Sequence, residues 1–348
     1  MNWAEQRVLV TGGASFIGSH LVEALIENKA RVRVVDNFVS GRLENLWPHS
    51  LIATASPFSN IFFSWVNPLQ IIEADLLDSL TVRRVFDGAT VVFHLAARHG
   101  GRGFVDQAQA PCATNFALDG LVFQAALAQK TKVVFASSGC VYPLHLQRDS
   151  GRVVPLKEDL VGPPYDPDNV YGHAKLVGEL TLRAFYDAHG LPSAIGRFFT
   201  VYGIRGYESH AITAMIARAF LDQDPFEVWG DGQAIRNWTN VHDIVRGLLL
   251  LAERVEDATA INLGTTDEIR VIDAVREILR YTGKTPRILY RLDKPVGPMT
   301  RVADNTLARE RLGWQPAIPF IEGLHKMIDR YFATKKEDEV RAIMEREG

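Results

Sequence analysis

The sequence has little cysteine and no long apolar run, and both absences restrict the kind of protein it encodes. Only two of its 348 residues are cysteines, Cys112 and Cys140, which excludes the disulfide framework of a small secreted domain. No run approaches the roughly 18 apolar residues of a membrane-spanning helix. A strand pattern begins at Arg7, which leaves no room for a signal peptide. These features favour a reducing, cytoplasmic compartment and no membrane partner.

Charge of one sign is not in large excess either. The chain has 38 Lys and Arg residues against 41 Asp and Glu residues, a formal net charge of -3 at pH 7. No long basic stripe is present, which argues against nucleic acid as the main partner. With 47% hydrophobic and 23% charged residues, the chain has the composition of one large or two closely packed domains. We therefore expect a small-molecule partner.

The first 200 residues alternate short β-branched runs with longer amphipathic segments. Strand character is found at 7–11, 32–36, 71–74, 91–95 and 133–137, and helix character at 16–27. This alternation predicts an α/β fold, with a parallel sheet connected by crossover helices. An interval rich in Pro, Ser, Asn and aromatic residues, 46–69, is expected to be an insertion after the second strand.

Beyond residue 200 the alternation gives way to Gly-, Pro- and Arg-bearing loops between helices at 212–221 and 241–253. This change predicts a smaller, substrate-facing α/β lobe over 201–333, with the chain crossing between it and the first domain, 1–200. The last residues, 334–348, carry charges of alternating sign and are expected to form a solvated helix or a frayed end.

A glycine-bearing turn at 11–18 joins the first strand to the first helix. Backbone N–H groups at such a helix N-terminus can bind a pyrophosphate, although an ordinary tight turn has the same composition. Asp36 ends the second strand, where its carboxylate can accept hydrogen bonds from an adenosine ribose and would repel a 2′-phosphate, so NAD is favoured over NADP. Asp75 and Leu76 follow the third strand and are candidates for the adenine edge, but Asp75 can equally cap a helix beginning near residue 79.

Tyr171 and Lys175 are four residues apart within a predicted helix, which places them on one face. An ammonium beside a phenol lowers the phenol pKa from about 10, so Tyr171 would become a usable base. A pattern this short also arises by chance in helices. The turn at 11–18 and the serines at 137 and 138 make a catalytic role the stronger interpretation.

Together these segments resemble the extended short-chain dehydrogenase/reductase family, and within it the nucleotide-sugar epimerases and dehydratases. The resemblance extends over nearly the whole chain, through the motifs at 11–18, 94–97, 137–143, 171–175, 229–238, 301–305 and 312–314. It implies a Rossmann domain, with a doubly wound parallel sheet that binds NAD, and a C-terminal lobe that binds a nucleoside-diphosphate sugar.

The resemblance also implies individual roles. Tyr171 is the base for the sugar hydroxyl, Lys175 lowers its pKa and holds the nicotinamide ribose, Ser138 hydrogen-bonds the reacting hydroxyl, and Asn115 supports the lysine. The turn residues expected to bind NAD are Gly12, Ser15, Phe16, Ile17 and Gly18.

Three positions depart from the family pattern. Ser15 replaces the middle glycine of the pyrophosphate loop. Thr200 replaces an asparagine near the sugar diphosphate, and Ile204 replaces a proline.

Cys140 distinguishes between the reactions of this family. Oxidation at C4 of the sugar acidifies the hydrogens on C3 and C5, so a nearby base diverts the ketone toward proton transfer, elimination or decarboxylation. Gly139 and Cys140 stand where the 4,6-dehydratases carry an Asp-Glu acid-base pair, which makes dehydration less favoured. The run 137–143 and the glycine-rich segment 100–104, with Gly101 and Arg102, resemble the GDP-mannose 3,5-epimerases, which use a cysteine and a lysine on opposite faces of the ring.

The lysine of that pair has no counterpart here, and His210 is the nearest titratable residue to its position. A histidine can return a proton near neutral pH. Alternatively, Cys140 is a packing residue and His210 a helix cap or surface residue. His94, His99 and His242 lack metal-ligand spacing, so no metal site is predicted.

Arg236 and Arg301 are the expected anchors of the substrate diphosphate, because guanidinium groups form bidentate bonds with phosphate oxygens. Arg102 or Arg205 is a further candidate, or a solvated side chain. The favoured partner is a GDP-hexose. The family also implies a homodimer through the helix of Tyr171, whose apolar residues Leu176, Val177, Leu180 and Leu182 suit either an interface or the core.

These observations favour NAD-dependent epimerisation with proton transfer at C5, C3 or both. The open alternatives are a C4-epimerase of a UDP-sugar, a dehydratase or decarboxylase, and a catalytically silent NAD-binding protein. A silent protein has no need to retain Ser138, Tyr171 and Lys175 together.

Overall fold

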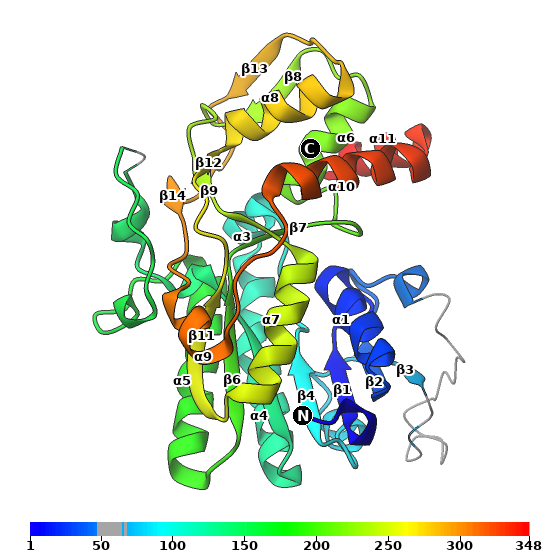
Figure 1. The fold of residues 1–348 in the computed structure, drawn as a ribbon, viewed down its shortest axis with the longest axis vertical. Helices are drawn as coiled ribbons and strands as arrows, with labels where there is room; N and C mark the ends of the chain where they lie inside the picture. Colours follow the sequence, from blue (N-terminus) through cyan, green and yellow to red (C-terminus); the bar gives the residue numbers. More distant parts are fainter. Residues whose placement is uncertain (47–64, 66–67, 150, 348) are drawn as a thin grey trace.

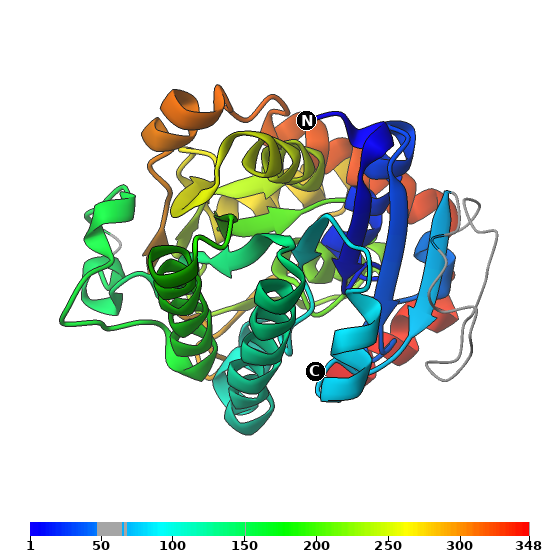
Figure 2. The same ribbon diagram turned by 90° about the horizontal axis from the view of Figure 1, so that it is seen from below.

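A seven-stranded parallel sheet forms the larger part of the molecule (Figures 1 and 2). The computed structural model describes residues 1–46, 65, 68–149 and 151–347, so most of the expected insertion at 46–69 lies outside the described residues. The strands lie in the order β11-β6-β5-β4-β1-β2-β3, and the direction of winding reverses between β4 and β1, as in a doubly wound sheet. Their bounds are β1 (Arg7–Thr11), β2 (Arg31–Asp36), β3 (Leu69–Glu73), β4 (Val91–His94), β5 (Lys132–Ser138), β6 (Ser193–Phe198) and β11 (Asp257–Leu263).

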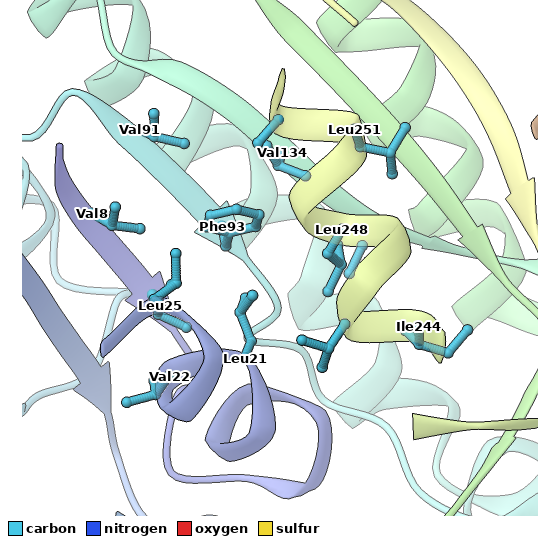
Figure 3. Close-up of a cluster of buried hydrophobic side chains, with 14 of the residues drawn as sticks. Val8, Leu21, Val22, Leu25, Val91, Phe93, Val134, Ile244, Leu248 and Leu251 are labelled. Carbon is cyan, nitrogen blue, oxygen red and sulfur yellow. The ribbon is translucent and has the colours of Figure 1, made fainter. Parts of the chain in front are cut away.

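Helices cover both faces of this sheet because its side chains alternate between two apolar cores. In β1, Val8 and Val10 face α1 (Phe16–Glu27) and α7 (Val241–Arg254), as Figure 3 shows for this core. Leu9 faces the opposite core, which contains residues of α2 (Ser79–Val85), α4 (Gln109–Gln129) and α5 (Asn169–His189).

A smaller lobe lies beyond the carboxyl ends of the strands and has its own core, which includes Ile216, Trp238 and Leu324. Its helices are α6 (Ala211–Phe220), α8 (Val271–Thr282), α10 (Phe320–Thr334) and α11 (Glu337–Glu347). Its strands pair as β7 (Thr200–Tyr202) with β10 (Trp238–Asn240), β8 (Phe226–Trp229) with β13 (Ile288–Arg291), and β9 (Ile235–Arg236) with both β12 (Ile269–Arg270) and β14 (Thr300–Arg301). The predicted α/β class, a doubly wound sheet with a smaller C-terminal lobe, is confirmed.

The chain returns from the lobe to the large sheet. The helix α7 packs on the sheet, β11 pairs with β6, and α9 (Thr306–Leu312) adds Leu312 to the core beneath α7. At the end of the chain, α11 is not fully solvated, because Val340 is buried in the core of the lobe. Within the described part of the chain, every helix is too short or too polar to span a bilayer.

Candidate active site

The carboxyl ends of β1, β4, β5 and β6 meet at the edge of the sheet that faces the lobe, where parallel α/β sheets bind ligands. A buried hydrogen-bond chain fixes the first two of these ends. The Thr11 Oγ1 lies 2.7 Å from the His94 Nδ1, and the His94 Nε2 lies 3.0 Å from the Asp119 Oδ1. Thr11 Oγ1 also accepts the Ala96 N–H at 3.1 Å. His94 is therefore a structural residue of this edge.

The turn at 11–18 has little room for side chains. Gly12 has a φ of +69°, and a Cβ there would lie 2.9 Å from the backbone nitrogen of Ala96. A Cβ at Gly18 would overlap the carbonyl oxygen of Gly12. Ser15, which replaces a glycine of the family pattern, donates its hydroxyl to the Gly12 carbonyl at 2.5 Å and precedes α1. The serine thus tightens the turn and does not use its own side chain to cap the N-terminus of α1, the kind of position where an anion can bind.

Asp36 lies at the carboxyl end of β2 and is 7% exposed. Its carboxylate accepts the Ala14 N–H at 3.0 Å and the Phe38 N–H at 2.9 Å. Burial raises the pKa of Asp36, and these two N–H donors oppose that effect. A carboxylate has about four acceptor sites, so two remain for ribose hydroxyls. Gly41, which the sequence analysis missed, lies so close that a Cβ would be 2.7 Å from the Asp36 Oδ1.

Asp75 does not cap α2, so that alternative is wrong. Its Oδ1 accepts the Leu77 N–H at 2.9 Å within a local turn. The N-cap is Asp78, whose carboxylate accepts the N–H groups of Leu80 and Thr81. Leu76 is buried in the core that contains α2.

Lys175 and Tyr171 lie together in the first turns of α5. The Lys175 ammonium is buried and, among the described residues, has no hydrogen-bond partner; it lies 4.5 Å from the centre of the Phe135 ring and 6.0 Å from that of Tyr171. Burial lowers its pKa, although Asp119 opposes this. A buried ammonium with unused donors fits a ligand that supplies hydroxyl groups.

Asn115 holds the loop after β4 instead of contacting this lysine. Its Oδ1 accepts the Arg98 N–H at 2.7 Å, and its Nδ2 donates to the Arg98 carbonyl at 3.0 Å.

Ser138, at the end of β5, accepts the backbone N–H of Cys140 at 3.1 Å, and its hydroxyl lies near that of Tyr171. Burial, and then the neighbouring Cys140 and Asp119, raise the pKa of Tyr171, whereas the nearby Ser138 hydroxyl opposes this. The chain's own groups therefore do not produce the expected lowering.

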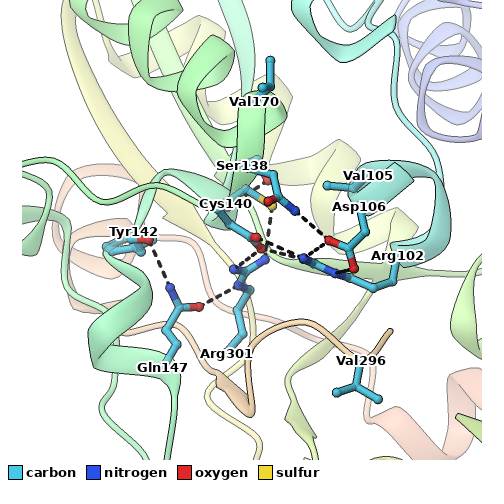
Figure 4. A network of polar contacts seen from close by, with 12 residues as sticks. Arg102, Val105, Asp106, Ser138, Cys140, Tyr142, Gln147, Val170, Val296 and Arg301 are labelled. Carbon is cyan, nitrogen blue, oxygen red and sulfur yellow. Dashed lines mark hydrogen bonds and ion pairs between the residues drawn. The ribbon is translucent and has the colours of Figure 1, made fainter. Parts of the chain in front are cut away.

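Cys140 is partly buried and belongs to a polar network (Figure 4). The Arg301 Nη1 donates to its Sγ at 3.1 Å, the Arg301 Nη2 donates to Asp168 at 2.8 Å, and the Arg301 Nε donates to Gln147 at 2.8 Å. Asp168 also accepts from Arg102 at 2.7 Å, and Arg102 binds Asp106 with its remaining donors. Cys140 therefore lies against a fixed cation instead of packing among apolar groups.

The three arginines of this region are held differently. Arg102 and Arg301 share the carboxylate of Asp168, whereas Arg236 donates only to the carbonyls of Ile235 and Val296, each at 2.8 Å, among the contacts of the described residues. Burial, and then Arg301 and Arg102, lower the pKa of Arg236 to about 9. An anion bound beside Arg236 would stabilise its charged form and so raise its pKa again, offsetting both burial and the neighbouring arginines.

A cavity of about 290 Å³ adjoins this network, lined by Arg102, Asp168, Asn169 and Met299 among others. Arg205, the other candidate for a phosphate, pairs instead with Glu23 of α1 at 2.5 Å. Thr200 begins β7, which pairs with β10 in the lobe.

His210 occupies the N-cap position of α6, as the alternative had it, but its side chain makes no capping hydrogen bond. Its ring lies 6.1 Å from that of His99, which lies 6.3 Å from that of Tyr171. Burial lowers the pKa of His210 to about 4. Gly101 allows this approach, because a Cβ there would overlap the Ser209 carbonyl oxygen. His99 and Asp168 were both missed as site residues; their only sequence signal is a polar residue near a strand end or helix start.

Residues 8–264 match the family described as NAD dependent epimerase/dehydratase. The chain belongs to this family. It is 29% identical over 341 residues to a UDP-N-acetyl-alpha-D-glucosaminuronate decarboxylase of Bacillus cytotoxicus, covering 93% of this chain and 97% of that protein. It is 29% identical over 339 residues to the GDP-mannose 3,5-epimerase of Arabidopsis thaliana, covering 96% and 83%. The UDP-glucose 4-epimerase of Thermotoga maritima, solved with UDP-glucose, matches with a TM-score of 0.80 and 28% identity over 94% of this chain and 99% of that one.

NAD is the cofactor of this family member, and the site fits it. The glycine turn accommodates only backbone, the Asp36 carboxylate retains acceptor capacity, and the buried Lys175 ammonium lacks a partner among the described residues. These groups would hold the pyrophosphate, the adenosine ribose and the nicotinamide ribose, respectively.

Proposed function

We propose that this enzyme epimerises a nucleoside-diphosphate hexose by carbon-acid chemistry, in the manner of the GDP-mannose 3,5-epimerases. The observation that carries the proposal is the 3.1 Å contact from the Arg301 guanidinium to the Cys140 sulfur. A guanidinium donor stabilises a thiolate over a thiol, and the thiolate is the basic form. A sulfur that only filled space would need no such donor.

NAD, when bound, accepts a hydride from the sugar and returns it at the end of the cycle. Tyr171 takes the proton of the sugar hydroxyl, which Ser138 orients through its own hydroxyl. The buried Lys175 ammonium favours the tyrosinate once ligands complete the site. The resulting C4 ketone acidifies the hydrogens on C3 and C5.

Cys140 then removes a proton from C5 or C3. Asp168 and Gln147 hold Arg301 in place, so the donor to the sulfur does not depend on a mobile side chain. We assign the return of a proton from the opposite face to His210. With a pKa of about 4, its protonated form costs about 4 kcal/mol at pH 7, and the negative substrate diphosphate reduces that cost.

Arg236 and Arg301 would bind the diphosphate, and Gly101, Arg102 and Thr200 would border the sugar. A GDP-hexose is favoured by the sequence likeness to the 3,5-epimerases, one of which is the Arabidopsis relative. The decarboxylase and the 4-epimerase among the similar proteins define the competing reactions.

The decisive experiment incubates the NAD-loaded enzyme with GDP-mannose, and with a panel of UDP-, CDP- and other GDP-sugars, in deuterium oxide. We expect proton NMR and mass spectrometry to find deuterium at C5 or C3 of an epimer. Cys140→Ser should lose at least about 100-fold of this exchange, because a hydroxyl is a far weaker base than a thiolate. Cys112→Ser, at the other and fully buried cysteine, is the matched control.

Other products would identify a different reaction. An epimer without deuterium, with unchanged turnover of Cys140→Ser, would identify a C4-epimerase. Loss of water or of carbon dioxide would identify a dehydratase or a decarboxylase.

We also propose a homodimer through α4 and α5. Phe116, Val177 and Leu180 are 40%, 44% and 44% exposed on these helices, whereas Leu176 and Leu182 are buried and belong to the core. Leu180→Asp should convert a dimer into a monomer in sedimentation velocity. Leu80→Asp, at an exposed position on α2, should leave the dimer intact, and a monomeric native protein would refute the proposal.

A further inference from the structure

The segment 203–210, which connects β7 to α6, is hydrogen-bonded to several residues of helix α1. The Ile204 carbonyl lies 2.9 Å from the His20 Nε2, and the Arg205 guanidinium binds Ser19 and Glu23. Tyr207 continues this contact to the very start of α1, where its hydroxyl accepts the Phe16 N–H at 3.2 Å. The substrate-side segment is thus attached to the helix that begins the cofactor turn.

The Phe16 N–H belongs to the first turn of α1, and N–H groups of that turn have no acceptor within the helix. They are the donors that a helix N-terminus offers to a phosphate. Ser40 and Asp36 both lie close enough to the Tyr207 hydroxyl to influence its pKa, Ser40 lowering it and Asp36 raising it. The hydroxyl therefore lies between the pyrophosphate turn and the residue that faces the adenosine ribose.

Tyr207 is equally close to His210. The His210 N–H donates to the Tyr207 carbonyl at 2.9 Å, and the two rings meet edge to face with centres 5.5 Å apart. The His210 ring also lies 6.4 Å from the ring of Phe16. A displacement of the tyrosine ring therefore changes the packing of the histidine.

We propose that Tyr207 is a positioning residue that couples NAD binding to His210: its hydroxyl holds the Phe16 N–H until the cofactor binds, and the pyrophosphate then displaces it and frees the Tyr207 side chain from α1, while the contacts of Ile204 and Arg205 with α1 remain. A charged phosphate oxygen is a stronger acceptor than a neutral hydroxyl, so it replaces the Tyr207 hydroxyl as the acceptor of the Phe16 N–H. The inference depends on NAD, not on which sugar or which carbon reacts. It implies that the cofactor binds before the substrate-side segment takes its working position.

The test compares NAD affinity by calorimetry, without substrate, in the wild type and Tyr207→Phe. Because phenylalanine cannot compete for the N–H, we expect tighter binding by about 2- to 10-fold, the range of one hydrogen bond. Tyr290→Phe, at an exposed tyrosine of β13, is the control and should bind as the wild type does. Weaker or unchanged affinity of Tyr207→Phe would overturn the proposal; weaker affinity would make the hydroxyl a direct ligand of the cofactor.

Hydrogen exchange supplies a second readout that does not depend on activity. We expect NAD to speed amide exchange over 207–210 in the wild type, and to change it little in Tyr207→Phe, where residue 207 already lacks its hydrogen bond to α1. Slower amide exchange in the wild type on adding NAD would contradict the displacement of the Tyr207 hydroxyl and refute the proposal.

Discussion

Asp168→Asn is a direct test of the charge network beside Cys140. The native carboxylate is buried, with 1% of its side chain exposed, and accepts from Arg102 at 2.7 Å and from Arg301 at 2.8 Å. Asparagine keeps the shape and one acceptor oxygen but removes the negative charge. Arg102 then retains Asp106, and Arg301 retains Gln147 and Cys140.

The magnitude follows from burial. Removing one partner of a buried ion pair costs about 3–5 kcal/mol of unfolding free energy. Because both arginines keep other partners and the amide oxygen still accepts, we expect the lower end, about 3 kcal/mol. Asp166→Asn is a matched control: its carboxylate is 42% exposed and pairs with His145, so it should lose at most about 1 kcal/mol.

The pH dependence has a definite sign. Burial raises the pKa of Asp168, but Arg301 and Arg102 outweigh it, so the pKa lies below its ordinary value. A lowered carboxyl pKa contributes stability above the unfolded pKa of about 3.9 and loses it as the pH falls through the folded value. The difference between wild type and Asp168→Asn should therefore stay constant from about pH 5 to pH 8 and shrink below about pH 4.

Urea unfolding, followed by the fluorescence of the six tryptophans, measures this difference without adding salt that would screen the pair. A loss below about 1 kcal/mol at pH 7, equal to that of the exposed control, would refute the reasoning. So would a loss that persists undiminished under acid conditions.

Three further predictions concern the same surroundings. His20 is buried against the Ile204 carbonyl, and burial lowers its pKa to about 4. Between about pH 4 and about pH 6.5 only the unfolded state binds the proton, so the wild type loses up to about 2 kcal/mol of stability through His20 as the pH falls from 7 to 5. His20→Asn should abolish this part of the loss, measured by urea unfolding at each pH. Gly18→Ala should weaken NAD binding at least about tenfold in calorimetry by forcing the turn apart, whereas Gly120→Ala, where a Cβ meets nothing within 4 Å, should not. Arg301→Lys in a Cys112→Ser background should slow alkylation of Cys140 by iodoacetamide about tenfold, because the guanidinium N–H that donates to the sulfur is lost, and an unchanged rate would show that Arg301 does not activate this sulfur.

The sequence predicted five of the seven strands of the large sheet, because their β-branched runs are long enough to show a period, but it missed β6 and β11. The first strand, 7–11, was placed as the structure has it, whereas β3 begins at Leu69, two residues before the predicted 71. The strands β9, β12 and β14 have two residues each and so carry no periodic signal. Their positions depend on the packing of the lobe.

In the site, local spacing was predictable and distant pairing was not. Tyr171 and Lys175 could be joined because one helix carries both. The pair of Arg102 with Asp168 spans 66 residues, and that of Arg301 with Cys140 spans 161, so only the folded chain reveals them. A family motif made Arg301 an expected phosphate anchor, but only the structure reveals its contact with the sulfur.

Arg301 can serve both Cys140 and a diphosphate without releasing either. A guanidinium has five N–H donors, and the contacts with Gln147, Cys140 and Asp168 use three of them. Arg102, Arg301 and Arg236 bring three positive charges to this region against the carboxylates of Asp168 and Asp106, which leaves one positive charge in excess. We infer that an incoming diphosphate meets this excess at Arg236, whose lowered pKa shows that its charge lacks compensation. Under the proposed function, the same anion would share Arg301 with the Cys140 sulfur, so substrate binding would act directly on the contact proposed to activate that sulfur.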